Sequence, residues 1–214
     1  MQNFNDLIEK SLEKLKDFDP ENIIQNLAVN PYLLVSVGAG DIRDKTRVAN
    51  YCFFPGFIDL LKPKQIIELG SAMGVGSVAM LTSSYKDFHF YGVTLRERGL
   101  EFCYVDSSRY PNFHPIIGDY LDMSIWPKDL DLSQTDLWYI DGEHSEAHVR
   151  ATLELYKPFF KPGATILMDD CSLNPGMQNV YDDLENIFPV KSKVLNYQLH
   201  WSGWGIIEVG DKND

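Results

Sequence analysis

Length, composition and charge exclude several classes of protein. The 214 residues carry a formal net charge of −12, and 44% are hydrophobic and 23% charged, as is ordinary for one globular domain. The acidic charge argues against nucleic acid and anionic membranes as partners, because both require a basic surface. Three scattered cysteines and the lack of a ~20-residue apolar run favour a cytoplasmic protein without a membrane span.

The first 45 residues predict a helical extension that precedes the main domain. Residues 2–18 show the apolar spacings of three and four that an amphipathic helix requires, at Phe4, Leu7, Ile8, Leu12 and Leu15. A second short helix is expected after Pro20. Residues 46–61 predict a helix with a kink or break at Pro55, since proline lacks the N–H that an interior helical position donates. We expect the extension to be a lid or the interface of a homo-oligomer, a dimer or higher.

From residue 65 onward, strands alternate with helices. Short apolar runs predict strands at residues 65–69, 88–95, 114–117, 136–140 and 164–168. Helices are expected at residues 76–83, 98–106, 145–160 and 176–188. This alternation is typical of an α/β protein with a mostly parallel sheet and helices on both faces. The last two strands, 193–200 and 204–209, are separated by three residues, so they predict an antiparallel hairpin.

A glycine-rich turn follows the first of these strands. It runs Glu68-Leu-Gly70-Ser-Ala-Met-Gly74-Val-Gly76. Glycines at a strand-to-helix turn permit positive φ and let a ligand approach the backbone, while the N–H groups of the helix point at that ligand. The spacing GxxxGxG differs from the GxGxxG of a pyrophosphate turn and lacks the lysine of a P-loop. The turn therefore predicts a ligand site of another kind.

Acidic residues end two apolar runs further along the chain. Asp141 follows the run 136–140, and Asp169 and Asp170 follow the run 164–168. If these strands are neighbours, roughly 4.8 Å apart, three carboxylates share a small volume. Like charges repel each other there unless a proton or a cation intervenes. The sequence therefore predicts a site for a hard divalent cation such as Mg²⁺, which prefers oxygen ligands.

His144 lies three residues after Asp141 and is the candidate general base, since a pKa near 6.5 leaves imidazole mostly neutral at pH 7. Glu143 is the weaker alternative, because helix N-termini attract acids for electrostatic reasons alone. His148 is expected on the helix surface. Asn174 and Gln178 are candidates for substrate contact. Core packing is expected, with a substrate-pocket wall as the alternative, for Tyr197, His200, Trp201 and Trp204.

The glycine-rich turn resembles motif I of the class I S-adenosylmethionine-dependent methyltransferases, and the resemblance covers about residues 45–210. It implies a Rossmann-like seven-stranded sheet, with residues 46–214 as the methyltransferase domain. The family's strand order places strand 65–69 beside 136–140, and 136–140 beside 164–168. The neighbouring strands that the acidic cluster needs thus follow from the resemblance.

The resemblance also implies where the cofactor binds. In the family the glycines face the methionine part of S-adenosylmethionine, and the acid at the position of Glu68 orients the turn. The second strand departs from the family, because Thr94 stands where an acid binds both ribose hydroxyls; Glu97 is expected to substitute. Asp119 is expected at the adenine. The cofactor contacts expected in all are Glu68, Gly70, Ser71, Gly74, Gly76, Thr94, Glu97, Asp119 and Asp141.

Within this fold, the chain resembles the metal-dependent O-methyltransferases of the catechol type and the sugar- or macrolide-modifying type. These enzymes place metal ligands at the positions of Asp141, Asp169 and Asp170, and a general base at that of His144. The resemblance implies transfer of a methyl group to a hydroxyl of a small molecule, such as a sugar, a catechol or a natural product. Mg²⁺ or another hard divalent cation would be the second cofactor.

Three alternatives stay open. The first is a metal-independent methyltransferase that acts on nitrogen or carbon, with the acids in structural roles. The second is a non-catalytic cofactor-binding subunit, suggested by the altered ribose position and by the first 45 residues. The third is a dehydrogenase on a Rossmann sheet, which the glycine spacing and the terminal hairpin disfavour.

Overall fold

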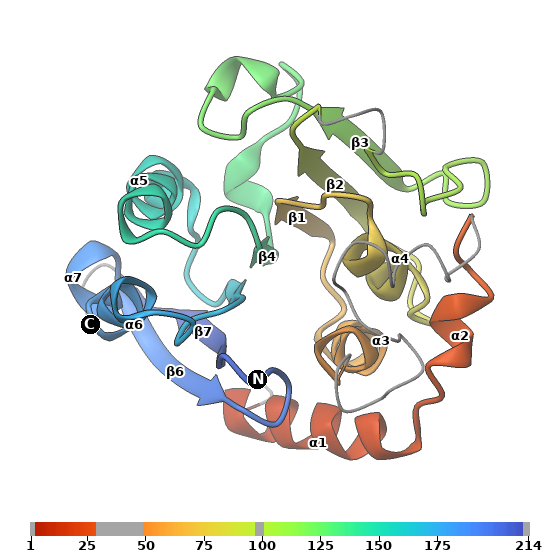
Figure 1. The fold of residues 1–214 in the computed structure, drawn as a ribbon, viewed down its shortest axis with the longest axis horizontal. Coiled ribbons are helices and arrows are strands. Elements are labelled where there is room, and N and C mark those ends of the chain that lie inside the picture. Colours follow the sequence, from red (N-terminus) through yellow and green to blue (C-terminus); the bar gives the residue numbers. More distant parts are fainter. Residues whose placement is uncertain (1–2, 29–48, 97–100, 212–214) are drawn as a thin grey trace.

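A seven-stranded sheet lies between two layers of helices (Figure 1). The computed structural model describes residues 3–28, 49–96 and 101–211. The strand order is β3-β2-β1-β4-β5-β7-β6, in which β7 runs antiparallel to both of its neighbours and the other pairs are parallel. The strands are β1 Gln65–Leu69, β2 His89–Thr94, β3 Phe113–Ile117, β4 Leu137–Ile140, β5 Thr165–Met168, β6 Val190–Asn196 and β7 Trp204–Val209. This architecture confirms the fold class predicted from the sequence.

The helices divide between the two faces of the sheet. α1, α3 and α4 pack on one face, and α5, α6 and α7 on the other (Figure 1). Short 3₁₀ turns lie at Met123–Ile125, Leu132–Gln134 and Lys157–Phe159. The α-helices are α1 Phe4–Asp17, α2 Glu21–Ile24, α3 Ala49–Leu61, α4 Val75–Leu81, α5 Glu146–Tyr156, α6 Pro175–Asp182 and α7 Leu184–Ile187.

Alternation along the strands explains why two cores form. Ile66 packs into the core beneath α1, α3 and α4, whereas its neighbour Ile67 packs into the core beneath α5 and α6. Both side chains are fully buried. Successive strand residues point to opposite faces, so a strand covered on both sides needs a continuous apolar run. The runs that predicted the strands therefore belong to strands buried on both faces.

The register brings three strand ends level with one another. Leu69 of β1 lies opposite Ile140 of β4, and Ile140 lies beside Met168 of β5. The order of strands also reverses between β1 and β4, which makes this the switch point where α/β sheets bind ligands. The residues that follow these three strands are Gly70, Asp141 and Asp169.

Two expected helices differ in the structure. Residues 101–104 form turns in place of the helix expected at 98–106, of which residues 97–100 lie outside the described residues. Phe102 has φ of 52°, and its N–H bonds to the carbonyl of Ala72 in the glycine-rich turn. The helix expected at 176–188 breaks at Asp183, whose carboxylate accepts hydrogen bonds from Arg150 at 2.6 Å and Asn186 at 2.6 Å.

The terminal antiparallel pair is confirmed, but its connection is longer than expected. β6 begins at Val190, because pairing with β7 extends to Val209. It ends at Asn196, whose side-chain oxygen accepts hydrogen bonds from the N–H groups of Gln198 and Leu199 and so turns the chain. Residues 197–203 therefore form a loop rather than a tight hairpin turn, and this loop carries a histidine toward the strand ends.

The N-terminal helices belong to the same core as the sheet. Leu7 and Ile8 of α1 are buried against α3. A Cβ at Gly56 of α3 would lie 3.0 Å from the Cβ of Lys14, so the absence of a side chain lets the two helices approach closely. α3 continues through Pro55, so the break that was one of the expectations for this proline does not occur.

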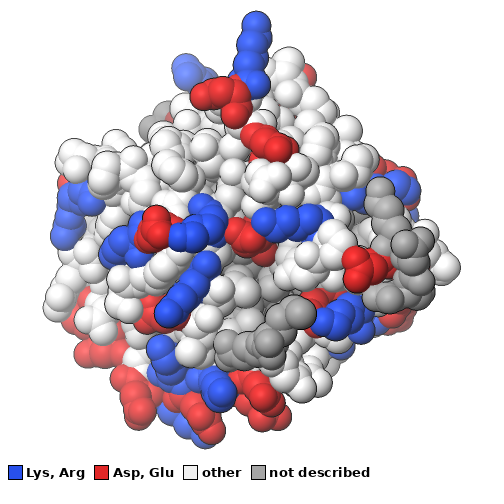
Figure 2. Space-filling view, turned by 180° about the vertical axis from the view of Figure 1, so that it is seen from behind, with Lys and Arg blue, Asp and Glu red and all other residues white. Residues whose placement is uncertain are grey.

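Charged side chains of both signs are interspersed on the face of the molecule shown in Figure 2. Among the described residues, no helix is long and apolar enough to cross a membrane.

Gly70 and Gly163 provide a matched pair for testing how closely β1 and β4 approach. Both have positive φ, of 106° and 79°, but a Cβ at Gly70 would lie 2.0 Å from the carbonyl oxygen of Asp141, whereas one at Gly163 would meet nothing within 4 Å. We expect Gly163→Ala to cost about 1 kcal/mol of unfolding free energy from backbone strain. Gly70→Ala should cost at least about 2 kcal/mol more. Urea denaturation measures both; equal losses would contradict the steric account.

Candidate active site

Glu68 organises the glycine-rich turn from beneath. It is 2% exposed, and its Oε2 accepts hydrogen bonds from Ser71 Oγ at 2.7 Å and Ser77 Oγ at 2.5 Å. A Cβ at Gly76 would lie 2.7 Å from the other carboxylate oxygen, so only glycine leaves room for the acid. Gly74 has φ of 90°, which favours glycine as well. Glu68 therefore shapes the turn while its own carboxylate stays covered.

Burial governs the proton affinity of Glu68. Desolvation raises the pKa of its carboxyl to about 7, against the opposing hydrogen bonds from Ser77 and Ser71. The charge of Asp141 raises it further. The turn thus rests on an acid that changes its charge near neutral pH.

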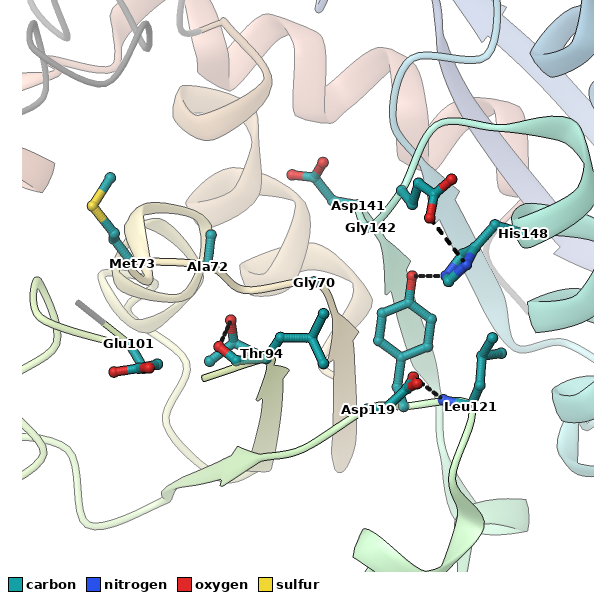
Figure 3. A pocket seen from close by; sticks show the side chains of 13 residues that line it. Gly70, Ala72, Met73, Thr94, Glu101, Asp119, Leu121, Asp141, Gly142 and His148 are labelled. Atoms are coloured by element: carbon teal, nitrogen blue, oxygen red, sulfur yellow. Dashed lines mark hydrogen bonds and ion pairs between the residues drawn. The ribbon is translucent and has the colours of Figure 1, made fainter. Parts of the chain in front are cut away.

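A cavity of about 890 Å³ opens over the strand ends (Figure 3). This volume lies within the range of small-molecule sites. In Figure 3, Thr94, Glu101 and Met73 lie on one side of Gly70, and Asp119 and His148 lie on the other. The lining consists of Gly70, Ala72, Met73, Thr94, Leu95, Glu101, Asp119, Tyr120, Leu121, Asp141, Gly142, Glu143 and His148. Four of the expected cofactor contacts are therefore in the lining, namely Gly70, Thr94, Asp119 and Asp141.

A glutamate that the sequence reasoning missed lines the cavity together with Thr94, the last residue of β2. Thr94 lines the cavity, but among the described residues its hydroxyl makes a single long contact of 3.4 Å, to the carbonyl of Leu95. Glu97 lies outside the described residues. Glu101 lines the cavity instead, and its Oε1 is buried with no hydrogen-bond partner among the described residues. Its only signal in the sequence is an acid seven residues after Thr94, inside a segment that was expected to be helical.

The far side of the cavity is held by a chain of polar contacts. Asp119 accepts a hydrogen bond from the N–H of Leu121 at 2.9 Å. The hydroxyl of Tyr120 lies 2.6 Å from Nε2 of His148, whose Nδ1 lies 3.4 Å from Glu143 (Figure 3). The surface position expected for His148 is therefore wrong, because the buried ring of Tyr120 reaches across from the end of β3 to the histidine.

Asp141, Asp169 and Asp170 meet beside this cavity, together with His144. Nδ1 of His144 lies 2.8 Å from Oδ2 of Asp170, and Nε2 lies 3.4 Å from Oδ1 of Asp141. Asp170 has φ of 56°, a left-handed conformation that is rare outside glycine. The chain has therefore left the strand after Asp169, which allows two adjacent aspartates to serve one cluster. Strained backbone of this kind is typical of functional sites.

Asp169 lies deepest in the cluster. It is 8% exposed, and its Oδ1 is buried without a hydrogen-bond partner among the described residues. Burial raises the pKa of its carboxyl well above the usual range, and the charges of Asp141 and Asp170 raise it further. A buried acceptor without a partner costs about 1–3 kcal/mol or more when charged. A proton or a cation bound to this oxygen would therefore remove the cost of burying it.

His144 and the aspartates shift one another's pKa values, so that the imidazole is favoured in its protonated form and Asp170 in its ionised form. Burial alone lowers the pKa of His144, but the carboxylates of Asp141 and Asp170 raise it to about 10. The pKa of Asp170 falls below its usual range, because contacts with His144, His200 and Ser202 outweigh its burial. The sequence argument assumed a neutral His144 at pH 7, which does not hold for the cluster without a cation.

His200 also belongs to the cluster, although the sequence indicated core packing or a pocket wall. The loop between β6 and β7 places its Nδ1 3.1 Å from Oδ1 of Asp170 and 3.6 Å from Oδ1 of Asp169. Ser202 lies between them: its Oγ is 2.6 Å from Nδ1 of His200 and donates to Asp170. No local pattern marks His200, since its approach depends on the pairing of β7 with β5.

Two tyrosines close the cluster on the side of α3. The hydroxyl of Tyr139 donates to Oδ2 of Asp141 at 2.8 Å. Burial raises the pKa of Tyr51 well above its usual value, and the charges of Asp141, Asp169, Glu68 and Asp170 raise it further. Both phenols therefore stay protonated beside the carboxylates.

The remaining candidates have structural partners or face outward. Asn174 caps α6 through Met177 and donates to the carbonyl of His144 at 3.0 Å, so it positions the histidine. Gln178 accepts from Ser172 and donates to Asp182. Among the aromatic residues of the terminal segment, Trp204 is buried in the core as expected. Core packing is wrong for the other two, since their exposed fractions are 57% at Tyr197 and 74% at Trp201.

The comparisons with known proteins agree with this geometry. A family model described as a methyltransferase domain matches residues 67–171, from β1 to the residue after Asp170. The chain carries a methyltransferase domain. This finding confirms the resemblance noted in the sequence and makes the protein a methyltransferase enzyme. No curated protein sequence matches the chain.

Solved structures resemble the chain over its whole length but at low identity, and so support the methyltransferase fold. The methyltransferase PaMTH1 of Podospora anserina, with SAH bound, has a TM-score of 0.64 and 12% identity, and the match covers 99% of each chain. The O-methyltransferase TomG of Streptomyces achromogenes, in complex with SAM, has a TM-score of 0.55 and 14% identity, covering 99% of this chain and 92% of TomG. A putative caffeoyl-CoA O-methyltransferase of Staphylococcus aureus has a TM-score of 0.51 and 18% identity, covering 94% and 92%.

The raised pKa of Glu68 gives a testable pH dependence. Between its ordinary value of 4.5 and about 7, the folded state binds more protons than the unfolded state, so Glu68 lowers the stability as pH rises through this window. We expect Glu68→Gln to gain up to about 3 kcal/mol relative to wild type between pH 4.5 and pH 8. Urea denaturation in chelator-treated buffer measures this gain. Glu9→Gln, on the exposed face of α1, should follow wild type; a gap between Glu68→Gln and wild type that does not change with pH would contradict the argument.

Proposed function

We propose that the enzyme transfers a methyl group from S-adenosylmethionine to a hydroxyl oxygen of a small molecule, with a divalent cation at the acidic cluster. The observation that carries the proposal is the buried, unpartnered Oδ1 of Asp169 beside Asp141, a residue that also lines the cavity. Similar structures support the cofactor and the oxygen acceptor: PaMTH1 has SAH bound, and TomG is an O-methyltransferase in complex with SAM.

The cavity residues fit the cofactor. The backbone beyond Gly70 and Ala72 is accessible at the strand end, as a ligand that packs on main chain requires. The free carboxylate oxygen of Glu101 suits the two hydroxyls of a ribose, which donate hydrogen bonds, and it would replace the acid that Thr94 lacks. Asp119 lies on the opposite side of Gly70, where the adenine would extend (Figure 3). Glu68, Ser71, Gly74 and Gly76 shape the turn beneath these contacts.

The acidic cluster fits a cation. Two groups of three side chains have ligand atoms within 4.8 Å of one another, namely Asp141, His144 and Asp169, and Asp169, Asp170 and His200. When bound, S-adenosylmethionine supplies an electrophilic methyl group, and a divalent cation lowers the pKa of an acceptor hydroxyl. Asp141, Asp169 and Asp170 would hold the cation, and their charge would then be balanced by it instead of by the proton of His144.

His144 is the group that would accept the proton of the substrate. It stands at the mouth of the cluster, with its backbone carbonyl held by Asn174 and its ring held by Asp170. Once a cation balances the carboxylates, the ring loses the electrostatic reason for its high pKa and becomes able to act as a base. Tyr139 and Tyr51 exclude water from the inner side of the cluster, which strengthens the electrostatic interactions there.

The substrate should be small and should carry a hydroxyl beside a second oxygen. Two vicinal oxygens can chelate one cation, as the ring of a catechol or a sugar allows. The net charge of −12 disfavours a polyanionic substrate. Sugars, catechols and hydroxylated natural products therefore form the proposed class, as the sequence indicated.

Removal of the cation or of the base tests the proposal. Chelator should abolish transfer of labelled methyl groups from S-adenosylmethionine to a panel of catechols and sugars, and an added divalent cation should restore it. His144→Ala should lower kcat about 10²–10⁴-fold, the usual contribution of a general base, while calorimetric binding of SAH stays within about twofold. His114→Ala, at the distant edge strand β3, should match wild type. Full transfer in chelator would leave a metal-independent methyltransferase, and absence of SAH binding would refute the proposed cofactor.

The proposed contact between Glu101 and the ribose of the cofactor can be tested by binding measurements with SAH. Glu101→Ala should weaken SAH binding about 10-fold or more, because hydrogen bonds to a charged group contribute about 1.5–3 kcal/mol. Thr94→Val should change binding much less. A double-mutant cycle with 2′-deoxy-SAH isolates the contact: loss of the 2′-hydroxyl should weaken binding to wild type and have little effect on Glu101→Ala. Equal effects on both proteins would place the ribose elsewhere.

A further inference from the structure

The groups of side chains able to hold a cation share one property that the sequence did not indicate. Each of the two groups contains a histidine, His144 in one and His200 in the other, and Asp169 belongs to both. From the sequence we expected the metal ligands to be Asp141, Asp169 and Asp170, which are all carboxylates. Among the described residues, the ligand atoms that come within 4.8 Å of one another in threes are thus mixed nitrogen and oxygen sets.

The two histidines approach Asp170 from opposite sides. Oδ2 of Asp170 faces His144 at 2.8 Å, and Oδ1 faces His200 at 3.1 Å. His200 comes from the β6–β7 loop and approaches the buried end of Asp169, whereas His144 follows β4 and lies against Asp141. This division leaves one imidazole for proton transfer and the other for a cation.

Asp169 shows where the cation would lie. Its Oδ1 has no hydrogen-bond partner in the described part of the chain and lies 3.6 Å from Nδ1 of His200, and the residue is more than nine-tenths buried. Ser202 lies 2.6 Å from the same nitrogen and donates its own proton to Asp170, so Nδ1 of His200 carries a proton in this arrangement. A metal ion that bound this nitrogen would take the place of that proton, because a ligating imidazole must be deprotonated at the ligand atom.

We propose that His200 is a metal ligand, with Asp169 and Asp170, and that the site takes a first-row transition cation such as Mn²⁺, Fe²⁺, Co²⁺ or Zn²⁺ in place of Mg²⁺. The affinity of a mixed nitrogen and oxygen site rises from Mn²⁺ through Fe²⁺ and Co²⁺, whereas Mg²⁺ selects oxygen ligands and retains its waters. The inference rests on the proposed function only in that it uses the same cluster. It changes the class of cation and assigns a ligand from the terminal loop.

The experiment uses full-length, untagged protein that has been freed of metal, since a polyhistidine tag would bind the same cations. Equilibrium dialysis compares Mn²⁺ with Mg²⁺ for wild type, His200→Ala and His200→Asn. Wild type should bind Mn²⁺ at least about 100-fold more tightly than Mg²⁺, and both variants should lose at least about 10-fold of this preference. His89→Ala is the matched control, because its ring lies on the exposed first residue of β2 and contacts His114 instead.

Pulsed electron paramagnetic resonance of the bound Mn²⁺ identifies the ligand directly. An imidazole nitrogen on the metal produces ¹⁴N modulation, which should be present in wild type and in His144→Ala and absent from both His200 variants. Modulation that persists in the His200 variants, or a Mn²⁺ preference that they retain, would overturn the proposal. Circular dichroism and urea denaturation verify that each variant is folded, and His200→Asn keeps a polar side chain beside Ser202 if His200→Ala unfolds.

Binding of SAH, measured by calorimetry on the same samples, separates this inference from the proposed function. SAH binding and chelator-sensitive methyl transfer with no nitrogen on the metal would refute the role of His200 and leave the methyltransferase proposal intact. A His200-dependent nitrogen signal without SAH binding would do the reverse.

Discussion

Negative charge concentrated at the ends of β4 and β5 is the constraint around which this end of the molecule is arranged. Asp141 and Asp169 follow strands that are level in the sheet, and Asp169 is almost fully buried. Donors from near and distant parts of the chain surround this charge: Tyr139 from β4 itself, His144 before α5, and His200 and Ser202 from the β6–β7 loop. Within residues 3–28, 49–96 and 101–211, one oxygen of Asp169 still has no hydrogen-bond partner. Segments that are far apart in the sequence therefore contact one another at the carboxyl ends of β4 and β5.

The same edge explains why the chain accepts strain and close backbone contacts there. Asp170 adopts a left-handed conformation so that it joins its neighbour in the cluster, and Gly70 has no side chain because the carbonyl of Asp141 occupies that space. Each feature costs conformational freedom or stability, and each lies within two residues of the end of a strand. Such costs are typical of sites where function overrides local preference.

Local signals were sufficient for the buried parallel strands and for the residues that follow them, but not for the bounds of β6. Buried strands such as β1 and β4 are continuous apolar runs, and the aspartates and glycines that end them are visible in the sequence for the same reason. The break at Asp183 depends on Arg150 from another helix, and the turns near Phe102 depend on Ala72, so neither is encoded locally. Glu101 and His200 reach the site through a turn and a loop whose paths only the folded chain defines. His148 was misplaced because its partner, Tyr120, lies 28 residues away.

Asp141 lies at the wall of the cavity and in the acidic cluster at once. A charge bound on either side of this carboxylate therefore alters the electrostatic potential on the other side. Linkage makes such an effect reciprocal: if a cation in the cluster changes the affinity for a ligand in the cavity, that ligand changes the affinity for the cation by the same factor. A single shared side chain would thus couple the occupancy of the two compartments, with no movement of the backbone required.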